Sequence, residues 1–236
     1  MAEIIKQWAP NVWSYRVKFI TSCEATAQMF LIAGAIALVF GFLFGILLTV
    51  TRKDGIRPNA LVFGIVDTFT NIFRSIPFVI LLIFLIPFTR MLVSTAIGVR
   101  GAIVPLVFGS VPFFTRQVET VLVNVDPGKI EAARSMGSGT AGIVFRVCLP
   151  EAVPELIRVT TITAISLIGL TTMAGAVGAG GIGSFAINYG QNLHHQDVVN
   201  LCVVVLLVTV SLLQTIGSFL ARRTTNRKLI RPRLHK

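Results

Sequence analysis

Charged residues are scarce in this chain of 236 residues: Asp, Glu, Lys and Arg together make up 13%, against about 25% in a typical soluble domain. Cysteine is rare as well, and the three present, Cys23, Cys148 and Cys202, are scattered and odd in number. That excludes a disulfide-stapled secreted domain, and the spacing does not suit metal ligands. Only ten residues are acidic, and no Ser/His/Asp set, carboxylate pair or Cys/His cluster has a spacing suited to catalysis. The sequence therefore predicts no enzyme active site and no metal site.

Apolar residues, in contrast, are abundant. They make up 54% of the chain, and the mean hydropathy is +0.81. This composition excludes an ordinary soluble enzyme and a disordered regulator. It indicates an all-α integral membrane protein.

Long apolar runs predict five transmembrane helices, since a spanning helix needs about 20 mostly apolar residues. The first and fifth come from the uncharged runs 25–51 and 198–221, and the fourth starts after Arg158. The second and third contain shorter uncharged runs, 75–89 and 101–115, so each must extend past a flanking arginine that snorkels to the interface. Pro87, Pro105 and Pro112 predict kinks in these two helices.

Two segments are predicted to lie at the membrane surface. Residues 1–23 mix Trp and Tyr with Lys and Arg, which is typical of the interface. Residues 59–73 have apolar side chains at helical spacing, with Asp67 and Asn71 on the other face. The second segment is therefore expected to be a helix lying along the membrane before the second span.

The placement of the basic residues predicts the orientation. With the N-terminus outside, 16 of the 21 Lys and Arg lie in cytoplasmic segments. We therefore expect an external N-terminus and a cytoplasmic C-terminus. The domain plan is an interfacial segment at 1–23, a transmembrane domain at 24–221 and a basic cytoplasmic tail at 222–236. The net charge of +11 is assigned to orientation and lipid headgroups, not to nucleic acid.

The loop at 126–150, between the third and fourth spans, carries several helix-capping signals. Asp126 is a good N-cap with Pro127 in the first helical position, and Gly137 can adopt the left-handed conformation that ends a helix. Ser138 or Thr140 can cap a second short helix, and Pro150 is expected to end it. Capping signals are common, so by themselves they also fit a well-capped loop without a partner.

The spacing within this loop resembles a known family. Three residues separate Glu131-Ala132-Ala133 from Gly137, nine more separate Gly137 from Val147, and Leu149-Pro150 follow. This spacing resembles the EAA loop of ABC importer permeases, which has Ile where this chain has Val147. The segment 73–77 (Phe-Arg-Ser-Ile-Pro) resembles an element of the amino-acid branch of these permeases. The glycine-rich segment 174–183, followed by Tyr189 and Gly190, resembles the permeases of methionine importers. The similarity runs from about residue 41 to 190.

The resemblance implies a five-span permease core of the bacterial cytoplasmic (inner) membrane. Two copies would pair with two ATPase subunits that bind ATP and Mg, and an extracytoplasmic binding protein would deliver methionine. This chain itself would bind no cofactor, and it has no G-x-x-x-x-G-K-[ST] motif. The resemblance implies a coupling helix in the loop, and the expected ATPase-coupling residues are Asp126, Gly128, Glu131, Ala132, Ala133, Gly137, Leu149 and Pro150.

Other features have both functional and structural interpretations. Met173 is a candidate gate. The candidate external turn comprises Gly175, Gly178, Gly180, Gly181 and Gly183; tight helix packing is the alternative, and nucleotide binding is not expected because no strand precedes the turn. Gly41 and Gly45 form a G-x-x-x-G pattern that fits a close helix contact, within the chain or between two copies, but the pattern is also frequent in membrane spans by chance. Arg116 and Glu119 are predicted to pair on one helical face.

Three alternatives to a methionine importer stay open from the sequence. The chain could be a permease for another amino acid or small solute. An ion-coupled secondary transporter is disfavoured, since neither an internal repeat nor an acidic residue within the clear span cores is evident. A non-transporting assembly subunit leaves the loop pattern unexplained.

Overall fold

The computed structural model describes residues 10–230, and these divide into two compact units. Unit 1 draws on Met1–Ile36, Ile76–Ser110 and Ala164–Leu212, and unit 2 on Ala37–Ser75, Val111–Thr163 and Leu213–Lys236. The predicted interfacial segment 1–23 and tail 222–236 extend into residues 1–9 and 231–236, which lie outside the described residues.

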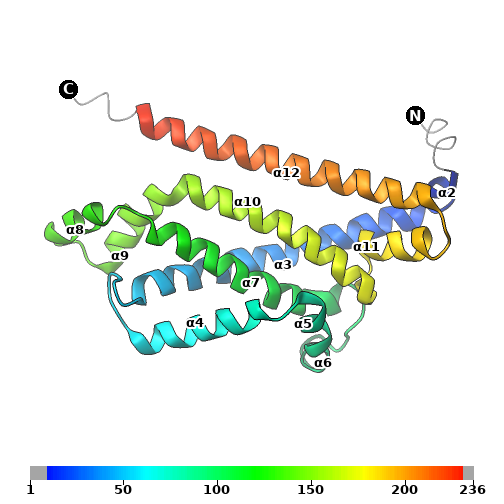
Figure 1. The fold of residues 1–236 in the computed structure, drawn as a ribbon, viewed down its shortest axis with the longest axis horizontal. Helices are drawn as coiled ribbons and strands as arrows, with labels where there is room; N and C mark the ends of the chain where they lie inside the picture. The colour runs from blue at the N-terminus through cyan, green and yellow to red at the C-terminus, as the bar shows by residue number, and fades with distance from the viewer. Residues whose placement is uncertain (1–9, 231–236) are drawn as a thin grey trace. The chain divides into compact units, whose positions relative to one another are not determined.

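All the elements of the described chain are helical (Figure 1). In chain order they are α2 (Pro10–Ser14), α3 (Arg16–Thr51), α4 (Ala60–Ser75), α5 (Phe78–Phe84), α6 (Ile86–Val93), α7 (Gly98–Val123), α8 (Pro127–Ser135), α9 (Thr140–Ile143), η1 (Val144–Cys148), α10 (Leu149–Ala174), η2 (Gly175–Ala179), α11 (Gly181–Phe185), η3 (Ala186–Gln191) and α12 (Gln196–Ile230), where η marks a π-helical turn.

Within the described residues, four helices are long and apolar enough to cross a membrane: Arg16–Thr51, Gly98–Val123, Thr140–Ala179 and Gln196–Thr225. The number rises to five if α4 and α5 are counted as one interrupted span. The first span is longer than predicted, because α3 begins at Arg16 within the expected interfacial segment. At the other end, α12 continues to Ile230 and so makes the first part of the predicted tail helical.

The predicted second span is not one continuous helix. The run 75–89 is divided between α5 and α6, which meet at Leu85. Pro77 precedes α5, and Pro87 lies in the first turn of α6. Proline has no N–H and cannot continue the hydrogen-bond ladder of a preceding helix, so the chain breaks here, next to the Pro87 for which a kink was predicted.

The third span is confirmed as a long helix. α7 extends past both Arg100 and Arg116, as its short uncharged run required. Pro105 and Pro112 lie inside this helix and do not end it. Helical segments of membrane proteins tolerate internal proline when neighbouring groups compensate for the lost hydrogen bond.

Two predictions about the start of the fourth span were wrong. Pro150 does not end a second short helix, because the chain is helical from Thr140 through η1 into α10. The fourth span therefore begins well before Arg158. In the π-helical turn before Pro150, the Leu149 N–H donates to the Val144 carbonyl, five residues back. This wider turn changes the hydrogen-bond register, and the helix continues through the proline.

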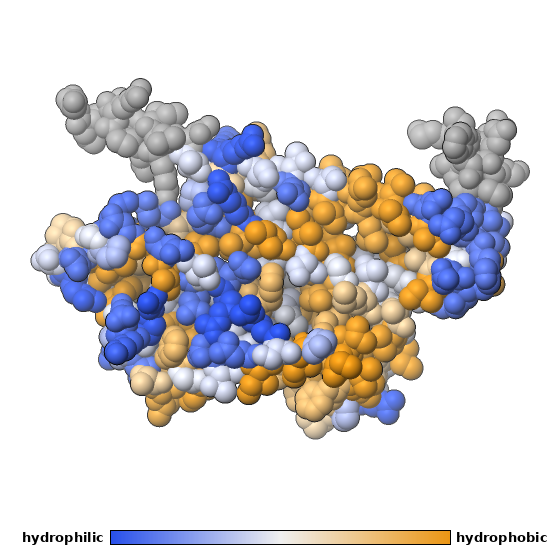
Figure 2. Space-filling model, viewed as in Figure 1, coloured by the Kyte–Doolittle hydropathy of each residue, from blue (hydrophilic) through white to orange (hydrophobic). Residues whose placement is uncertain are grey.

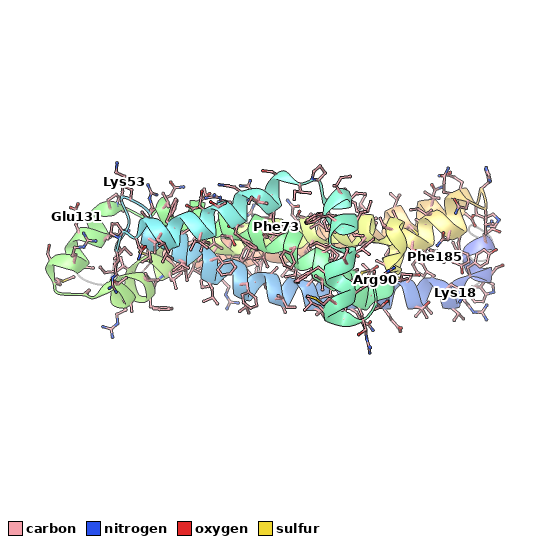
Figure 3. All side chains as sticks on the ribbon, turned by 90° about the horizontal axis from the view of Figure 1, so that it is seen from below. Lys18, Lys53, Phe73, Arg90, Glu131 and Phe185 are labelled. Carbon is pink, nitrogen blue, oxygen red and sulfur yellow. The ribbon has the colours of Figure 1, made fainter. Side chains whose placement is uncertain are left out.

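α4 lies beside α3 and α7 in unit 2 (Figures 1 and 3). Phe69 of α4 meets Phe44 of α3 edge-on, with 6.3 Å between ring centroids. The polar face of α4 meets Arg116 of α7 through Asp67 and Asn71. α4 is therefore a member of the helix bundle, which corrects the prediction of a separate helix on the membrane surface.

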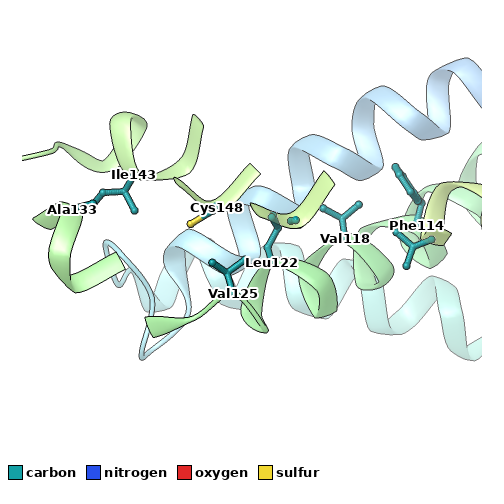
Figure 4. Close-up of a cluster of buried hydrophobic side chains, with 9 residues drawn as sticks. Phe114, Val118, Leu122, Val125, Ala133, Ile143 and Cys148 are labelled. Atoms are coloured by element: carbon teal, nitrogen blue, oxygen red, sulfur yellow. The ribbon is translucent and has the colours of Figure 1, made fainter. Parts of the chain in front are cut away.

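Close packing in unit 2 depends on two glycines of α3. A Cβ atom on Gly41 would lie 2.8 Å from Phe114 Cδ1, and one on Gly45 would lie 2.6 Å from Val118 Cβ. Of the interpretations left open for this pattern, the structure therefore supports a close contact within the chain, between α3 and α7. The core of unit 2 continues from there to α8 (Figure 4), and its buried members are Phe114, Val118, Leu122, Val125, Ala133, Ile143, Cys148, Ala152 and Val159.

Candidate functional site

The segment from Asp126 to α9 folds as a helix, a sharp corner and a second helix. Asp126 Oδ1 accepts a hydrogen bond from the Gly128 N–H at 2.9 Å, which caps α8, and Pro127 takes the first helical position. Gly137 has φ +79°, and the Ser138 N–H donates to the Ala133 carbonyl at 3.0 Å. These contacts confirm the predicted cap and glycine corner.

The three residues of the Glu-Ala-Ala sequence point in different directions. Glu131 and Ala132 are exposed, whereas Ala133 is only 3% exposed and packs in the core of unit 2. Figure 4 shows Ala133 and Ile143 close to one another in this cluster, with Cys148 farther along it. Ala133 therefore attaches α8 to the rest of its unit. Glu131 and Ala132 are left exposed on the surface of α8.

Two large apolar side chains are exposed on either side of the corner. Met136 is 79% exposed and Phe145 is 64% exposed. Both side chains add exposed apolar area to a largely polar segment. The sequence analysis missed both residues, because their exposure depends on the π-helical turn and on the direction that the chain takes after Gly137.

Two polar contacts hold α8 in place. Arg134 Nη2 donates to the Ile56 carbonyl at 3.0 Å, which joins α8 to the turn between α3 and α4. Lys129 Nζ lies 2.9 Å from Glu151 Oε1 at the start of α10. Between α8 and the α3–α4 turn is a cavity of about 340 Å³ that Glu131 and Arg134 help to line.

The remaining predicted coupling residues lie where α10 begins. Leu149 is half-buried and packs against the core of unit 2, whereas Pro150 is exposed in the first turn. The hydrophilic side chains of this part of the molecule gather over α8 and the α3–α4 turn (Figure 2). Figure 3 places Glu131 and Lys53 at the same end of unit 2. We call the surface made by 126–145 the α8 surface.

A charged cluster lies farther along the same unit, between α4 and α7. Arg116 Nη1 donates to Glu119 Oε2 at 2.6 Å, as predicted, and Nη2 donates to Asn71 Oδ1 at 2.8 Å and also to Asp67 Oδ1. The side chains of Arg116, Asp67 and Glu119 are 21%, 28% and 14% exposed. The sequence analysis found the pair within α7 but missed the two residues of α4, because it placed α4 on the membrane surface.

The glycine-rich segment of unit 1 forms a tight reversal. Gly178, Gly180 and Gly181 have φ of +93°, +81° and +79°, backbone angles that residues with a side chain rarely adopt. A Cβ atom on Gly183 would lie 2.2 Å from the Thr172 carbonyl oxygen. Close packing at the end of α10 and a turn are therefore both present. Met173, just before the turn, is 49% exposed.

His194 and His195 lie between η3 and α12. Among the described residues, no group of three His, Cys, Asp or Glu side chains is arranged to hold a metal ion. Asp197 instead accepts two hydrogen bonds from Asn11, from the backbone N–H at 3.1 Å and from Nδ2 at 3.0 Å. These bonds connect the start of α12 to α2 within unit 1.

Comparison with known proteins places the chain in a family. Residues 37–229 match the family described as binding-protein-dependent transport system inner membrane component. The chain is 39% identical over 208 residues to the probable D-methionine transport system permease protein MetI of Vibrio cholerae serotype O1, covering 88% of this chain and 92% of the relative. It is 45% identical over 174 residues to the methionine import system permease protein MetP of Bacillus subtilis (strain 168), covering 74% of this chain and 78% of that relative.

The fold also matches a solved structure. A chain of the MetNI methionine ABC transporter in inward-facing conformations superposes with a TM-score of 0.86 and 42% sequence identity. The match covers 89% of this chain and 98% of that chain. The helices, the apolar composition and these similarities agree with one another, and the chain belongs to the family of binding-protein-dependent transport system inner membrane components.

Proposed function

We propose that this chain is the membrane-spanning permease subunit of an ATP-driven importer of methionine in the bacterial cytoplasmic membrane. The family match over residues 37–229 and the similarity to methionine permeases support this function. The sequence has no G-x-x-x-x-G-K-[ST] motif, and we assign the binding of ATP and Mg and the hydrolysis of the nucleotide to partner ATPase subunits.

The structural observation that carries the proposal is the α8 surface. Glu131 and Ala132 face outward from a capped helix, and Met136 is 79% exposed beside them. Ala132 leaves the helix narrow enough to enter a groove, Glu131 offers a carboxylate to basic groups at the groove's rim, and Met136 offers apolar area. The same surface would be cytoplasmic in the orientation that the basic residues predict.

In the proposed mechanism, two copies of the chain pair with two ATPase subunits and line one pathway. ATP binding closes the ATPases, their motion displaces the α8 surface, and the helices switch between inward-open and outward-open arrangements. An extracytoplasmic binding protein delivers the amino acid. We assign Met173 as a gate of this pathway, and the glycine-rich reversal after it as an external turn that closes the pathway or meets the binding protein.

Glu131→Lys tests the coupling role. The chain is purified with its ATPase partner, reconstituted into liposomes with the binding protein, and assayed for ATP-dependent uptake of radiolabelled methionine. We expect the variant to insert normally, with uptake reduced at least tenfold. Glu155→Lys reverses the charge of an exposed glutamate on α10 and is the matched control. Normal uptake by Glu131→Lys would contradict the assignment of the α8 surface.

A further inference from the structure

We propose that the cavity beside the α3–α4 turn of unit 2 binds a zwitterionic α-amino acid with a slender apolar side chain. The identification of that amino acid as methionine rests on the proposed function. The site is separate from the α8 surface, and it would hold the transported solute at the end of the helices where we place the cytoplasm.

The cavity has a volume of about 680 Å³, within the usual range of about 300–1,000 Å³ for small-molecule sites. One wall is the end of α3 with the turn that follows, and another is the beginning of α4. Glu119 of α7 completes the lining. All of these residues belong to unit 2.

The charged groups of the cavity have both signs. Arg52 and Lys53 supply the cations, and Asp54 and Glu119 supply the carboxylates. Arg52 Nη2 lies 3.7 Å from Asp54 Oδ2, and Glu119 is held by Arg116 through Oε2. A carboxylate of the ligand can pair with Arg52 or Lys53, while its ammonium can pair with Glu119.

This mixture of charges favours an amino acid over a simple anion. A phosphate group would gain the two cations but would also face Asp54 and Glu119, and like charges at short distance repel. A ligand that carries only an ammonium group would be repelled by the two cations, Arg52 and Lys53. A zwitterion can pair its carboxylate with a cation of the cavity and its ammonium with a carboxylate of the cavity.

Apart from the polar Thr51 and Asn59, the rest of the lining is apolar and suits a thioether side chain. Pro58, Ala60 and Phe63 border the cavity on the side of α4. Sulfur makes favourable contacts with aromatic rings, typically at about 5 Å. Phe63 therefore offers the side chain of methionine a partner that a purely polar ligand would not use.

The cavity also borders the turn that anchors α8. Arg52 and Asp54 line both this cavity and the smaller one that contains Glu131 and Arg134. The Ile56 carbonyl in the same turn accepts the hydrogen bond from Arg134. A ligand that pairs with Arg52 therefore contacts the segment on which α8 rests.

The test uses the purified permease–ATPase complex in detergent and photo-methionine, a diazirine analogue, as the probe. We expect light-induced crosslinks within 51–63, and we expect excess methionine to suppress them. Methioninol lacks the carboxylate and 4-(methylthio)butanoate lacks the ammonium, so each should compete about tenfold more weakly than methionine.

Two matched variants attribute the signal to the cavity. Lys53→Gln removes one lining cation and should weaken methionine binding about tenfold. Arg57→Gln removes a cation from the same turn that lies outside the lining and should leave binding unchanged. Glu119→Gln should also weaken binding. If this variant does not fold because it loses its contact with Arg116, Lys53→Gln still tests the site.

Three results would overturn the inference: crosslinks confined to other parts of the complex, equal effects of Lys53→Gln and Arg57→Gln, or protection by added phospholipid but not by methionine. The last result would assign the cavity to a lipid headgroup.

Measuring methionine uptake by the same preparation separates the test of this site from the test of the proposed function. Normal methionine uptake without binding in the cavity rejects only the site, whereas absence of methionine uptake rejects the proposed substrate.

Discussion

Arg116 of α7 and Asp67 of α4 form an ion pair across 49 residues of sequence. The same guanidinium also binds Asn71 of α4 and Glu119 of its own helix. One cation therefore satisfies polar groups on two apolar helices of unit 2. Charged groups on membrane helices are costly unless they are paired, so Arg116 both requires this pairing and fixes α4 against α7.

Replacement of Arg116 should destabilise unit 2. In Arg116→Leu, Asp67 and Glu119 lose their cation, and because these side chains are partly exposed we expect a loss of about 1–3 kcal/mol. Thermal unfolding in detergent measures the change. Arg158→Leu breaks the exposed pair with Glu155 at 3.0 Å and should cost less than about 1 kcal/mol. Equal effects of the two variants would show that the cluster contributes nothing beyond a surface pair.

A charge exchange tests the direct contact between α4 and α7. The double variant Asp67→Arg, Arg116→Asp restores opposite charges at the two positions. We expect it to be more stable than either single variant, with a coupling energy of about 0.5–3 kcal/mol in a double-mutant cycle. Strictly additive effects would mean that the two residues do not stabilise the fold through one another.

Enlargement of Gly45 should separate α3 from α7. A Cβ atom at this position would lie 2.6 Å from Val118 Cβ and 3.0 Å from the Thr115 carbonyl oxygen. Gly45→Val should therefore cost about 1–3 kcal/mol through overpacking. Gly64→Ala in α4 is the control, because nothing lies within 4 Å of its added Cβ. It should be neutral or stabilise the helix by up to about 1 kcal/mol.

The stability of the corner after α8 should depend on the backbone conformation of Gly137 alone. Gly137 has φ +79° and nothing within 4 Å of an added Cβ, so Gly137→Ala should cost about 1 kcal/mol from backbone strain. Amide hydrogen exchange over residues 127–137 should become about fivefold faster. Gly137→Asn should show a smaller effect, since Asn tolerates the left-handed region. Exchange that is fastest in the Asn variant would contradict this explanation.

Loss of the Asp197 carboxylate should release α2 from the start of α12. Asp197→Ala removes both hydrogen bonds from Asn11, each worth about 1 kcal/mol. We expect faster amide exchange at 11–14 and cleavage there by a nonspecific protease. The neighbouring variant Gln196→Ala removes a hydrogen bond to Asn200 within the same helix and should leave exchange at 11–14 unchanged.

Local signals predicted the α8 segment well. Asp126, Pro127 and Gly137 act through the nearest few residues, and the structure confirms each as cap, first turn or corner. Such features follow from backbone geometry within one turn. The failure at Pro150 is local too, but its cause is the π-helical turn of 144–148, which has no simple sequence signature.

The arrangement around α4 could not be predicted in the same way. Its helical periodicity was evident, and so was its polar face with Asp67 and Asn71. The partner of that face, Arg116, lies on another helix, and nothing in the local pattern indicates which face meets which helix. The exposure of Met136 and Phe145 was missed for the same reason, since burial depends on packing across the unit.

The sequence by itself determined the membrane class, the long helices α3, α7 and α12, and the caps of α8, because hydropathy and helix-end chemistry act along the chain. Only the tertiary structure decided that α4 packs beside α7, that Ala133 faces inward while Glu131 faces outward, and that Arg134 rests on the Ile56 carbonyl. The physical reason is that these contacts join residues far apart in the chain. Their free energy exists only once the helices have packed.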